Sequence, residues 1–192
     1  MQTKAIATSL LVAVGAVAFF AAPARADVVA AYVQGHGGVG NNEGGTRAST
    51  SGSSSSGLSP AVGFQLGARL LIFEGYYDRT AFGSGASVSR GILGLRVGLG
   101  GEGLRLVLHA GGGVVTEEGG ALTGMTVGAA ERNGVVGRAG VALEKRLMPA
   151  LWGGAALDGE VFSLSAATSS TGPRTEGQDA FLSLYLKFEL GI

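Results

Sequence analysis

Acidic and basic side chains recur at alternate positions in several segments of this 192-residue sequence. Asp158 and Glu160 stand two residues apart, a spacing that puts both carboxylates on one face of an extended strand. Two carboxylates on one face can divide the roles of general acid and general base. Arginines are frequent in the neighbouring segments, however, so the pattern favours ion pairing over catalysis.

Neither histidine belongs to a pattern typical of a metal or catalytic site. His36 begins a Gly-rich run, and His109 lies in another segment, so that two isolated histidines and no cysteine make a poor metal site. The Gly-rich runs 35–40 and 111–113 do not lie between a strand and a helix, so neither fits a phosphate-binding loop. We therefore predict no catalytic residue, no cofactor-binding residue, no metal ligand and no cofactor.

The elements that position these charges are strands, and the last of them is the clearest. From Ala180 to Ile192 every second residue is apolar, and most of the residues between them are polar or small. Strict alternation predicts a β-strand with one apolar face. The run exceeds the ~5–6 residues of an ordinary strand and suits a tilted strand that crosses a bilayer, which needs ~9–11 residues.

Seven more segments alternate in the same way, which makes eight expected strands in all. Residues 90–99 are typical, because Leu93, Leu95 and Val97 alternate with Gly94 and Arg96. Alternation at every second position is the signature of a strand whose two faces meet different surroundings. The other expected strands span 28–35, 62–69, 73–78, 104–111, 135–144 and 151–161.

The connections between the expected strands alternate in length. The connections 37–59, 83–89, 116–133 and 165–178 are long and polar, whereas the others are only a few residues each. Long loops at one rim and tight turns at the other are typical of a transmembrane barrel, and an even strand number puts both termini at the short-turn rim. Within the third long connection, an alternative to a loop is that residues 121–129 extend a hairpin above the membrane.

Alternation alone does not say which face of the strands is outside. The apolar face persists along most strands for about the length that an apolar band ~25 Å tall requires. The polar face is mostly Gly and Ala with sparse charges, as a cramped lumen needs, and an export signal precedes the strands. These observations favour lipid-facing Leu and Val. The alternative is a secreted lipocalin-like barrel whose apolar face lines a binding pocket.

Residues 1–26 are typical of a secretory signal peptide. Lys4 provides a positive start, residues 5–22 are mainly apolar, and Ala24-Arg25-Ala26 has the form of a peptidase cleavage site. We expect cleavage after Ala26 and a barrel domain over 27–192; the alternative is an uncleaved membrane helix. No later segment has the ~18 consecutive apolar residues of a membrane helix, so any membrane residence of the mature protein must come from strands.

Composition excludes several functional classes. The chain has 14 Lys+Arg and 14 Asp+Glu, so its formal net charge is zero, and we expect no nucleic-acid partner because such proteins carry a basic excess. Charged residues make up 15%, below the ~25% of a soluble domain. The absence of cysteine excludes disulfide bonds and the anchor of a lipoprotein.

With this pattern the chain resembles the small eight-stranded outer-membrane β-barrels of the OmpA/OmpX type over 28–192. Its final strand, 185–192 (Tyr-Leu-Lys-Phe-Glu-Leu-Gly-Ile), is similar to the terminal signal read by the barrel-assembly machinery. Family members usually end in Phe or Trp, whereas this chain ends in Ile192 and its nearest aromatic residue is Phe188. The resemblance covers the barrel alone, and we expect no peptidoglycan-binding domain after it.

The resemblance implies an all-β, closed, antiparallel up-and-down transmembrane barrel in the outer membrane of a Gram-negative cell envelope. Its implied partners are outer-membrane lipid, lipopolysaccharide and the barrel-assembly machinery. Some barrels of this size are lipid-modifying hydrolases that use His, Ser and an acid. This sequence has no His-x-Ser arrangement, so we expect that the protein is not an enzyme.

The charged residues on the inner faces are the best candidate for a functional constellation. An eight-stranded barrel is only wide enough for its own side chains, and a buried unpaired charge costs several kcal/mol, so these charges must pair. Glu144 is a candidate partner for Arg96. We expect a structural or adhesion role with four loops presented to an unidentified extracellular partner; a narrow channel for ions or small solutes is the alternative. The expected lumen charges are Arg69, Arg90, Arg96, Arg105, Arg138 and Lys187, with Glu74, Asp78, Glu144, Asp158, Glu160 and Glu189.

Overall fold

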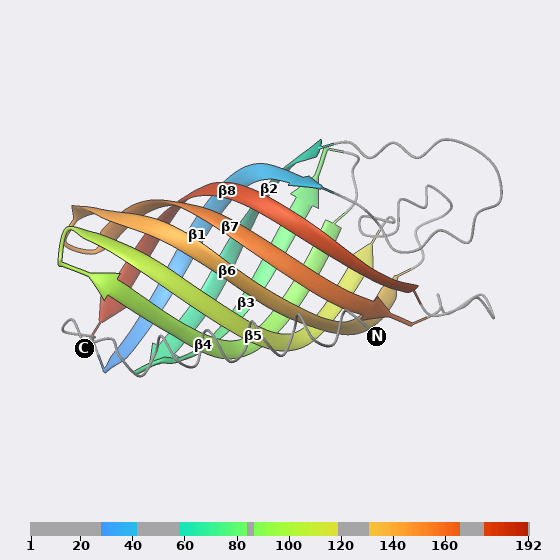
Figure 1. Ribbon diagram of the computed structural model, residues 1–192, viewed down its shortest axis with the longest axis horizontal. Coiled ribbons are helices and arrows are strands. Elements are labelled where there is room, and N and C mark those ends of the chain that lie inside the picture. Colours follow the sequence, from blue (N-terminus) through green and yellow to red (C-terminus); the bar gives the residue numbers. More distant parts are fainter. Residues whose placement is uncertain (1–27, 42–57, 84–86, 119–130, 166–174, 192) are drawn as a thin grey trace.

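The structure, a computed structural model, describes residues 28–41, 58–83, 87–118, 131–165 and 175–191, which form one closed barrel of antiparallel strands (Figure 1). Each strand pairs with its neighbours in the chain, and the last strand pairs with the first. No helix in these ranges is long and apolar enough to cross a membrane. The strands are β1 (Val29–Asn41), β2 (Leu58–Leu70), β3 (Phe73–Phe82), β4 (Ser87–Gly100), β5 (Leu104–Glu118), β6 (Arg132–Met148), β7 (Leu151–Leu164) and β8 (Thr175–Gly191).

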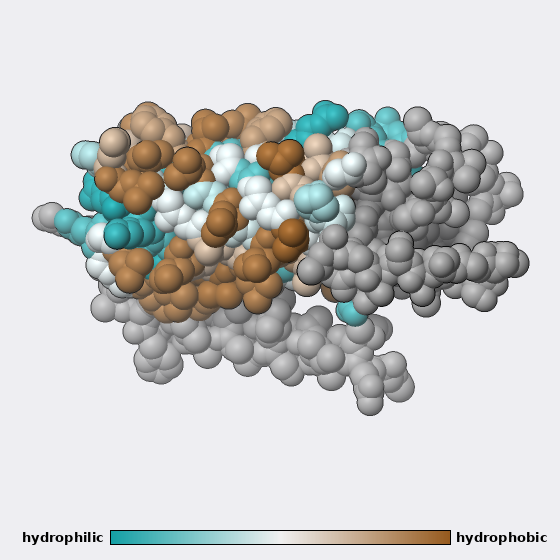
Figure 2. Space-filling model, turned by 90° about the horizontal axis from the view of Figure 1, so that it is seen from above, coloured by the Kyte–Doolittle hydropathy of each residue, from teal (hydrophilic) through white to brown (hydrophobic). Residues whose placement is uncertain are grey.

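Burial alternates along the strands and confirms the predicted orientation of their faces. In β8, Tyr185 and Lys187 are buried, whereas Leu184 and Leu186, which alternate with them, are exposed at 70% and 57%. The same alternation recurs around the barrel, so the Leu and Val side chains lie on the outer wall, where apolar side chains are spread over the face seen in Figure 2. This outer wall is the one suited to lipid.

The strands extend further into the expected loops than the sequence indicated. At the loop end, β1 continues to Asn41, β4 starts at Ser87, β5 runs to Glu118 and β8 starts at Thr175. These extensions contain many Gly, Asn, Asp and Glu residues, which are depleted in strands. Pairing with a neighbouring strand on each side overrides this weak strand propensity. The expected signal peptide and the possible hairpin at 121–129 lie outside the described residues.

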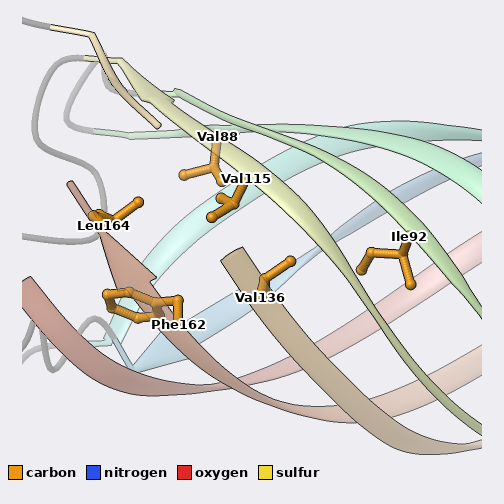
Figure 3. Packing of buried hydrophobic residues seen from close by; sticks show 6 residues of the cluster. All are labelled: Val88, Ile92, Val115, Val136, Phe162 and Leu164. Atoms are coloured by element: carbon orange, nitrogen blue, oxygen red, sulfur yellow. The ribbon is translucent and has the colours of Figure 1, made fainter. Parts of the chain in front are cut away.

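The loop end of the lumen contains an apolar cluster. Val88, Val115, Val136 and Leu164 pack there with Phe162, on strands β4 to β7, and Ile92 lies deeper (Figure 3). Tyr76 and Phe82 pack against this cluster from β3, and all of it lies on the inner face. The inner face is therefore polar only in part. Glu117 and Arg132 are buried near the loops beside this cluster, and a second apolar cluster lies among the charges further from the loops, formed by Val107, Ala142, Ala156 and Tyr185.

Candidate functional site: the charged lumen

The structure places all twelve of the expected lumen charges on the inner wall of the barrel. They lie on seven strands, from β2 to β8, and their ion pairs join them, together with both histidines, into two separate networks. The short-turn network contains Arg69, Glu74, Arg96, Arg105, Glu144, Lys187 and Glu189. The loop-end network contains His36, Asp78, Arg90, His109, Arg138, Asp158 and Glu160.

Glu144 is the centre of the short-turn network. Its Oε1 accepts hydrogen bonds from Arg96 (2.6 Å), Lys187 (2.6 Å) and the hydroxyl of Tyr185 (2.7 Å). Its Oε2 accepts one from Nε of Arg105 (2.5 Å). Three cations from β4, β5 and β8 thus converge on one carboxylate that is itself fully buried. Glu144, which the sequence offered as a candidate partner of Arg96, lies next to it in the structure.

Two other carboxylates complete the short-turn network. Glu189 lies 3.1 Å from Arg105, 3.0 Å from Lys187 and 3.5 Å from Arg69. Glu74 lies 3.3 Å from Arg96 and accepts a 2.8 Å hydrogen bond from the hydroxyl of Tyr32. Four cations therefore face three carboxylates. A buried charge is tolerated only when it is paired and hydrogen-bonded, and this network meets that condition for each carboxylate.

Trp152 lies inside the barrel and stacks on this network. The guanidinium carbon of Arg105 lies 3.8 Å from the centroid of the Trp152 ring, a cation–π contact. In the alternation of β7, Trp152 lies on the same face as Asp158 and Glu160. Tyr76 and Phe162 are on the inner face as well, whereas Tyr77 and Phe188 are exposed on the outer wall.

In the loop-end network, two arginines hold three carboxylates. Arg90 donates to Asp78 (2.9 Å) and to Glu160 (3.0 Å). Arg138 donates to Asp158 (2.9 Å) and lies 3.4 Å from Glu160. Asp158 and Glu160, the pair that could have acted as acid and base, are therefore each engaged by arginine. This geometry supports ion pairing and not proton transfer to a substrate.

The histidines join the loop-end network through aspartate and threonine side chains. His36 Nε2 lies 3.3 Å from Thr80 Oγ1 and 3.8 Å from Asp78, so one ring nitrogen faces both groups. A catalytic triad places the hydroxyl and the carboxylate at opposite ring nitrogens. His109 Nε2 lies 2.6 Å from Asp158. No cluster of three or more potential metal ligands occurs in the described part of the chain.

Glycines on the inner face make room for the long side chains. A Cβ at Gly67 would lie 2.4 Å from the ring of Tyr32, and one at Gly154 would lie 2.6 Å from the ring of Tyr185. At Gly140 a Cβ would lie 2.3 Å from the carboxylate of Asp158. Since real Cβ atoms do not approach so closely, glycine is required at these positions. The mixture of small and long inner residues seen in the sequence is thus the packing solution of a narrow lumen.

A small cavity of about 30 Å³ separates the two networks. Its wall includes Glu74 and Arg96 of the short-turn network and His109 and Arg138 of the loop-end network. Neutral polar side chains complete the wall, among them Gln34, Gln65, Ser183 and Tyr185. Sequence reasoning concentrated on charges and missed these residues, although their place in the inner-face alternation would have identified them.

Comparisons with known proteins support the fold. No protein-family model and no curated protein matches the sequence. Among solved structures, the chain is similar to the N-terminal β-barrel domain of Pseudomonas aeruginosa OprF, with a TM-score of 0.52 and 13% identity over 84% of this chain and 97% of that one. It is also similar to Neisserial surface protein A (NspA), with a TM-score of 0.54 and 8% identity over 83% and 96% of the two chains. The chain therefore has the fold of the small eight-stranded outer-membrane barrels, as the sequence predicted.

Proposed function

We propose that this protein is a structural or adhesive barrel of the outer membrane, with a lumen closed by its own side chains and loops that meet an extracellular partner. The convergence of Arg96, Arg105 and Lys187 on the buried Glu144 is the observation that carries this proposal. Opening a path there would separate several buried ion pairs at once. We further propose that the protein is not an enzyme, since its histidines lack triad geometry.

The proposal includes export and assembly. Signal peptidase cuts after Ala26, the domain over 27–192 enters the outer membrane, and the barrel-assembly machinery reads the last strand, β8. Lipid and lipopolysaccharide then surround the outer wall. N-terminal sequencing of protein from isolated outer membranes should start at Asp27. A sequence starting at Met1, or recovery from the soluble periplasm, contradicts this part of the proposal.

Single-channel recording in planar bilayers tests whether the lumen is closed. The wild-type barrel should give no steady openings, because side chains occupy the lumen along its length. The double variant Glu144→Ala/Lys187→Ala is the matched control: it removes one anion and one cation, leaves Arg96 with Glu74 and Arg105 with Glu189, and should give measurable openings. Steady wild-type openings of uniform size contradict the closed barrel.

A narrow channel for ions or small solutes is the second candidate function. The cavity between the two networks favours it, because it is polar space in the middle of the lumen. The recordings above decide between the two candidates. A secreted lipocalin-like barrel is less well supported, since the large apolar side chains lie on the outer wall; it predicts a mature protein that stays in solution without detergent.

A further inference from the structure

The turn between β2 and β3 is apolar throughout, unlike the β4–β5 turn. Leu70, Leu71, Ile72 and Phe73 form an uninterrupted apolar run around it, with exposures of 54%, 51%, 42% and 60%. The β4–β5 turn contains glycines and Glu102 instead. The β6–β7 turn is also apolar, with Leu147 and Met148 exposed at 50% and 64%, but Lys145 and Arg146 directly precede it. A turn that ends in water is normally polar, so this turn carries the wrong residues for an aqueous rim.

The backbone of this turn is bonded to the strands on both sides of the hairpin. The amide of Leu71 donates to the carbonyl of Val28 (2.8 Å), and the carbonyl of Ile72 accepts from the amide of Arg96 (2.8 Å). Leu71 also has a positive φ of 56°, a conformation that turns usually assign to Gly or Asn. A large apolar residue therefore stands where backbone geometry favours a small or polar one. In lipid, each backbone polar group needs a partner within the protein, and these two groups have one.

The turn is also set back from the rim. Phe73 pairs with Leu95, and β4 runs on from there to Gly100 before the next turn. Figure 1 shows the β2–β3 turn short of the β4–β5 and β6–β7 turns along the long axis of the barrel. The apolar band of the outer wall thus continues without interruption around this turn.

A hollow in the outer wall begins beside the turn. It measures about 740 Å³, and Leu70, Phe73, Leu93 and Leu95 line it. The small residues Ala68 and Gly75 form part of its wall, and a Cβ at Gly75 would lie 2.9 Å from the side chain of Leu93. The hollow lies over Ala68 and Gly75, two positions whose side chains are small where the neighbouring outer wall has Leu or Phe.

We propose that the β2–β3 turn is embedded in the lipid of the short-turn leaflet and that the hollow above it seats an acyl chain of a phospholipid. The proposal rests on the function proposed above, a barrel that spans the outer membrane. We choose an acyl chain as the occupant because the hollow and the turn belong to the same outward apolar surface that contacts lipid. With the turn held in lipid, the protein wall at β2 and β3 ends within the leaflet, whereas β4 and β5 continue past it toward the rim.

Single-cysteine labelling tests the position of the turn, and the chain has no cysteine of its own. The variants Leu71→Cys and Ile72→Cys are placed in phosphatidylcholine nanodiscs and exposed to a charged, membrane-impermeant maleimide. Glu102→Cys in the β4–β5 turn is the aqueous reference, and Leu184→Cys on the outer wall is the lipid reference. Both turn variants should react about tenfold more slowly than Glu102→Cys, because the charged reagent must leave water to reach them.

The outcomes separate this inference from the function on which it rests. Turn variants that react as fast as Glu102→Cys, while Leu184→Cys stays protected, overturn the embedded turn and leave the membrane barrel intact. If Leu184→Cys also reacts at the rate of Glu102→Cys, the membrane barrel itself is wrong. Testing two turn positions guards against a failure to fold at the strained Leu71.

Lipid retention tests the seat in the hollow. Native mass spectrometry of protein released from the same nanodiscs should show wild type retaining one phosphatidylcholine more than the variant Ala68→Leu/Gly75→Leu, whose added side chains fill the hollow. Ala68→Leu alone provides a milder filling if the double variant folds poorly. Ala155→Leu, on the outer-face alternation of β7, is the control and should retain lipid like wild type. Equal retention by wild type and the filled variants overturns the seat.

Discussion

The inner and outer walls of this barrel are built from the same strands and hold the structure together in opposite ways. On β8, Lys187 and Glu189 face inward and are buried among partners on other strands. Leu186 and Phe188 face outward and are about half exposed. Inside, each residue needs particular partners; outside, it needs only an apolar surface. Substitutions on the two walls should therefore fail for different reasons.

The largest effect is expected at Glu144, on the inner wall. Glu144→Gln keeps the shape of the side chain but leaves Arg96, Arg105 and Lys187 without their shared carboxylate. Breaking a buried pair on one side typically costs about 3–5 kcal/mol of unfolding free energy. Urea unfolding in lipid vesicles measures it. Glu102→Gln on the exposed β4–β5 turn is the control and should change stability by less than about 0.5 kcal/mol.

The next effect is expected on the outer wall. Leu184→Arg puts a charge where the side chain faces lipid and should cost about 2–4 kcal/mol near mid-membrane. Leu95→Arg, on the outward face of β4, should behave in the same way, although neighbours cover Leu95 more. Unfolding in vesicles and the resistance of the unboiled protein to detergent in gels report the loss. A harmless Leu184→Arg combined with a stabilising Arg96→Leu means that the barrel is inside out.

A smaller and more specific effect distinguishes the partners of Arg96. Arg96→Leu leaves Glu74 without a cation, whereas Glu144 keeps Lys187 and Arg105. Adding Glu74→Gln should therefore recover about 1–2 kcal/mol, within the usual range of coupling between contacting residues. Adding Glu144→Gln should recover less, because it strands two other cations. If Glu74→Gln and Glu144→Gln recover the same unfolding free energy, Glu144 is not the centre of the short-turn network.

The smallest effect concerns the aromatic residues of the two walls. Trp152→Phe weakens the contact with Arg105 in the lumen and should cost about 1 kcal/mol. Phe188→Leu exchanges one lipid-facing apolar residue for another and should stay within about 0.5 kcal/mol. Both are measured by urea unfolding in vesicles. The reverse order would contradict the inward position of Trp152.

The sequence predicted which residues face inward and outward better than it predicted the strand ends and the ion-pair partners in the lumen. Period-two alternation assigned Leu184 and Lys187 to opposite faces, and both assignments are correct because a strand has only two faces. Strand ends were predicted too short at Asn41, Ser87 and Glu118. These ends are set by pairing with a neighbouring strand, and local composition does not contain that information.

Partners inside the lumen depend on register, which alternation does not determine. The inner positions of Arg96 and Glu144 were predictable, and their pairing was a candidate among several. That Glu144 receives three cations, while Glu74 receives one, follows from the registers of β4, β5, β6 and β8. A shift of two residues keeps every face and changes every partner.

The pairing of β1 with β8 has a consequence for how the chain acquires its structure. Ala30 pairs with Gly191, so the final ladder joins the two ends of the described chain. Contacts so distant in sequence slow folding, because the intervening chain must be ordered before they form. Until that step, a sheet of seven or eight strands has two free edges, which are templates for aggregation. Closure therefore converts an aggregation-prone intermediate into a structure without edges. A substitution confined to β1 or β8 should block this closure even where it lowers the unfolding free energy only slightly.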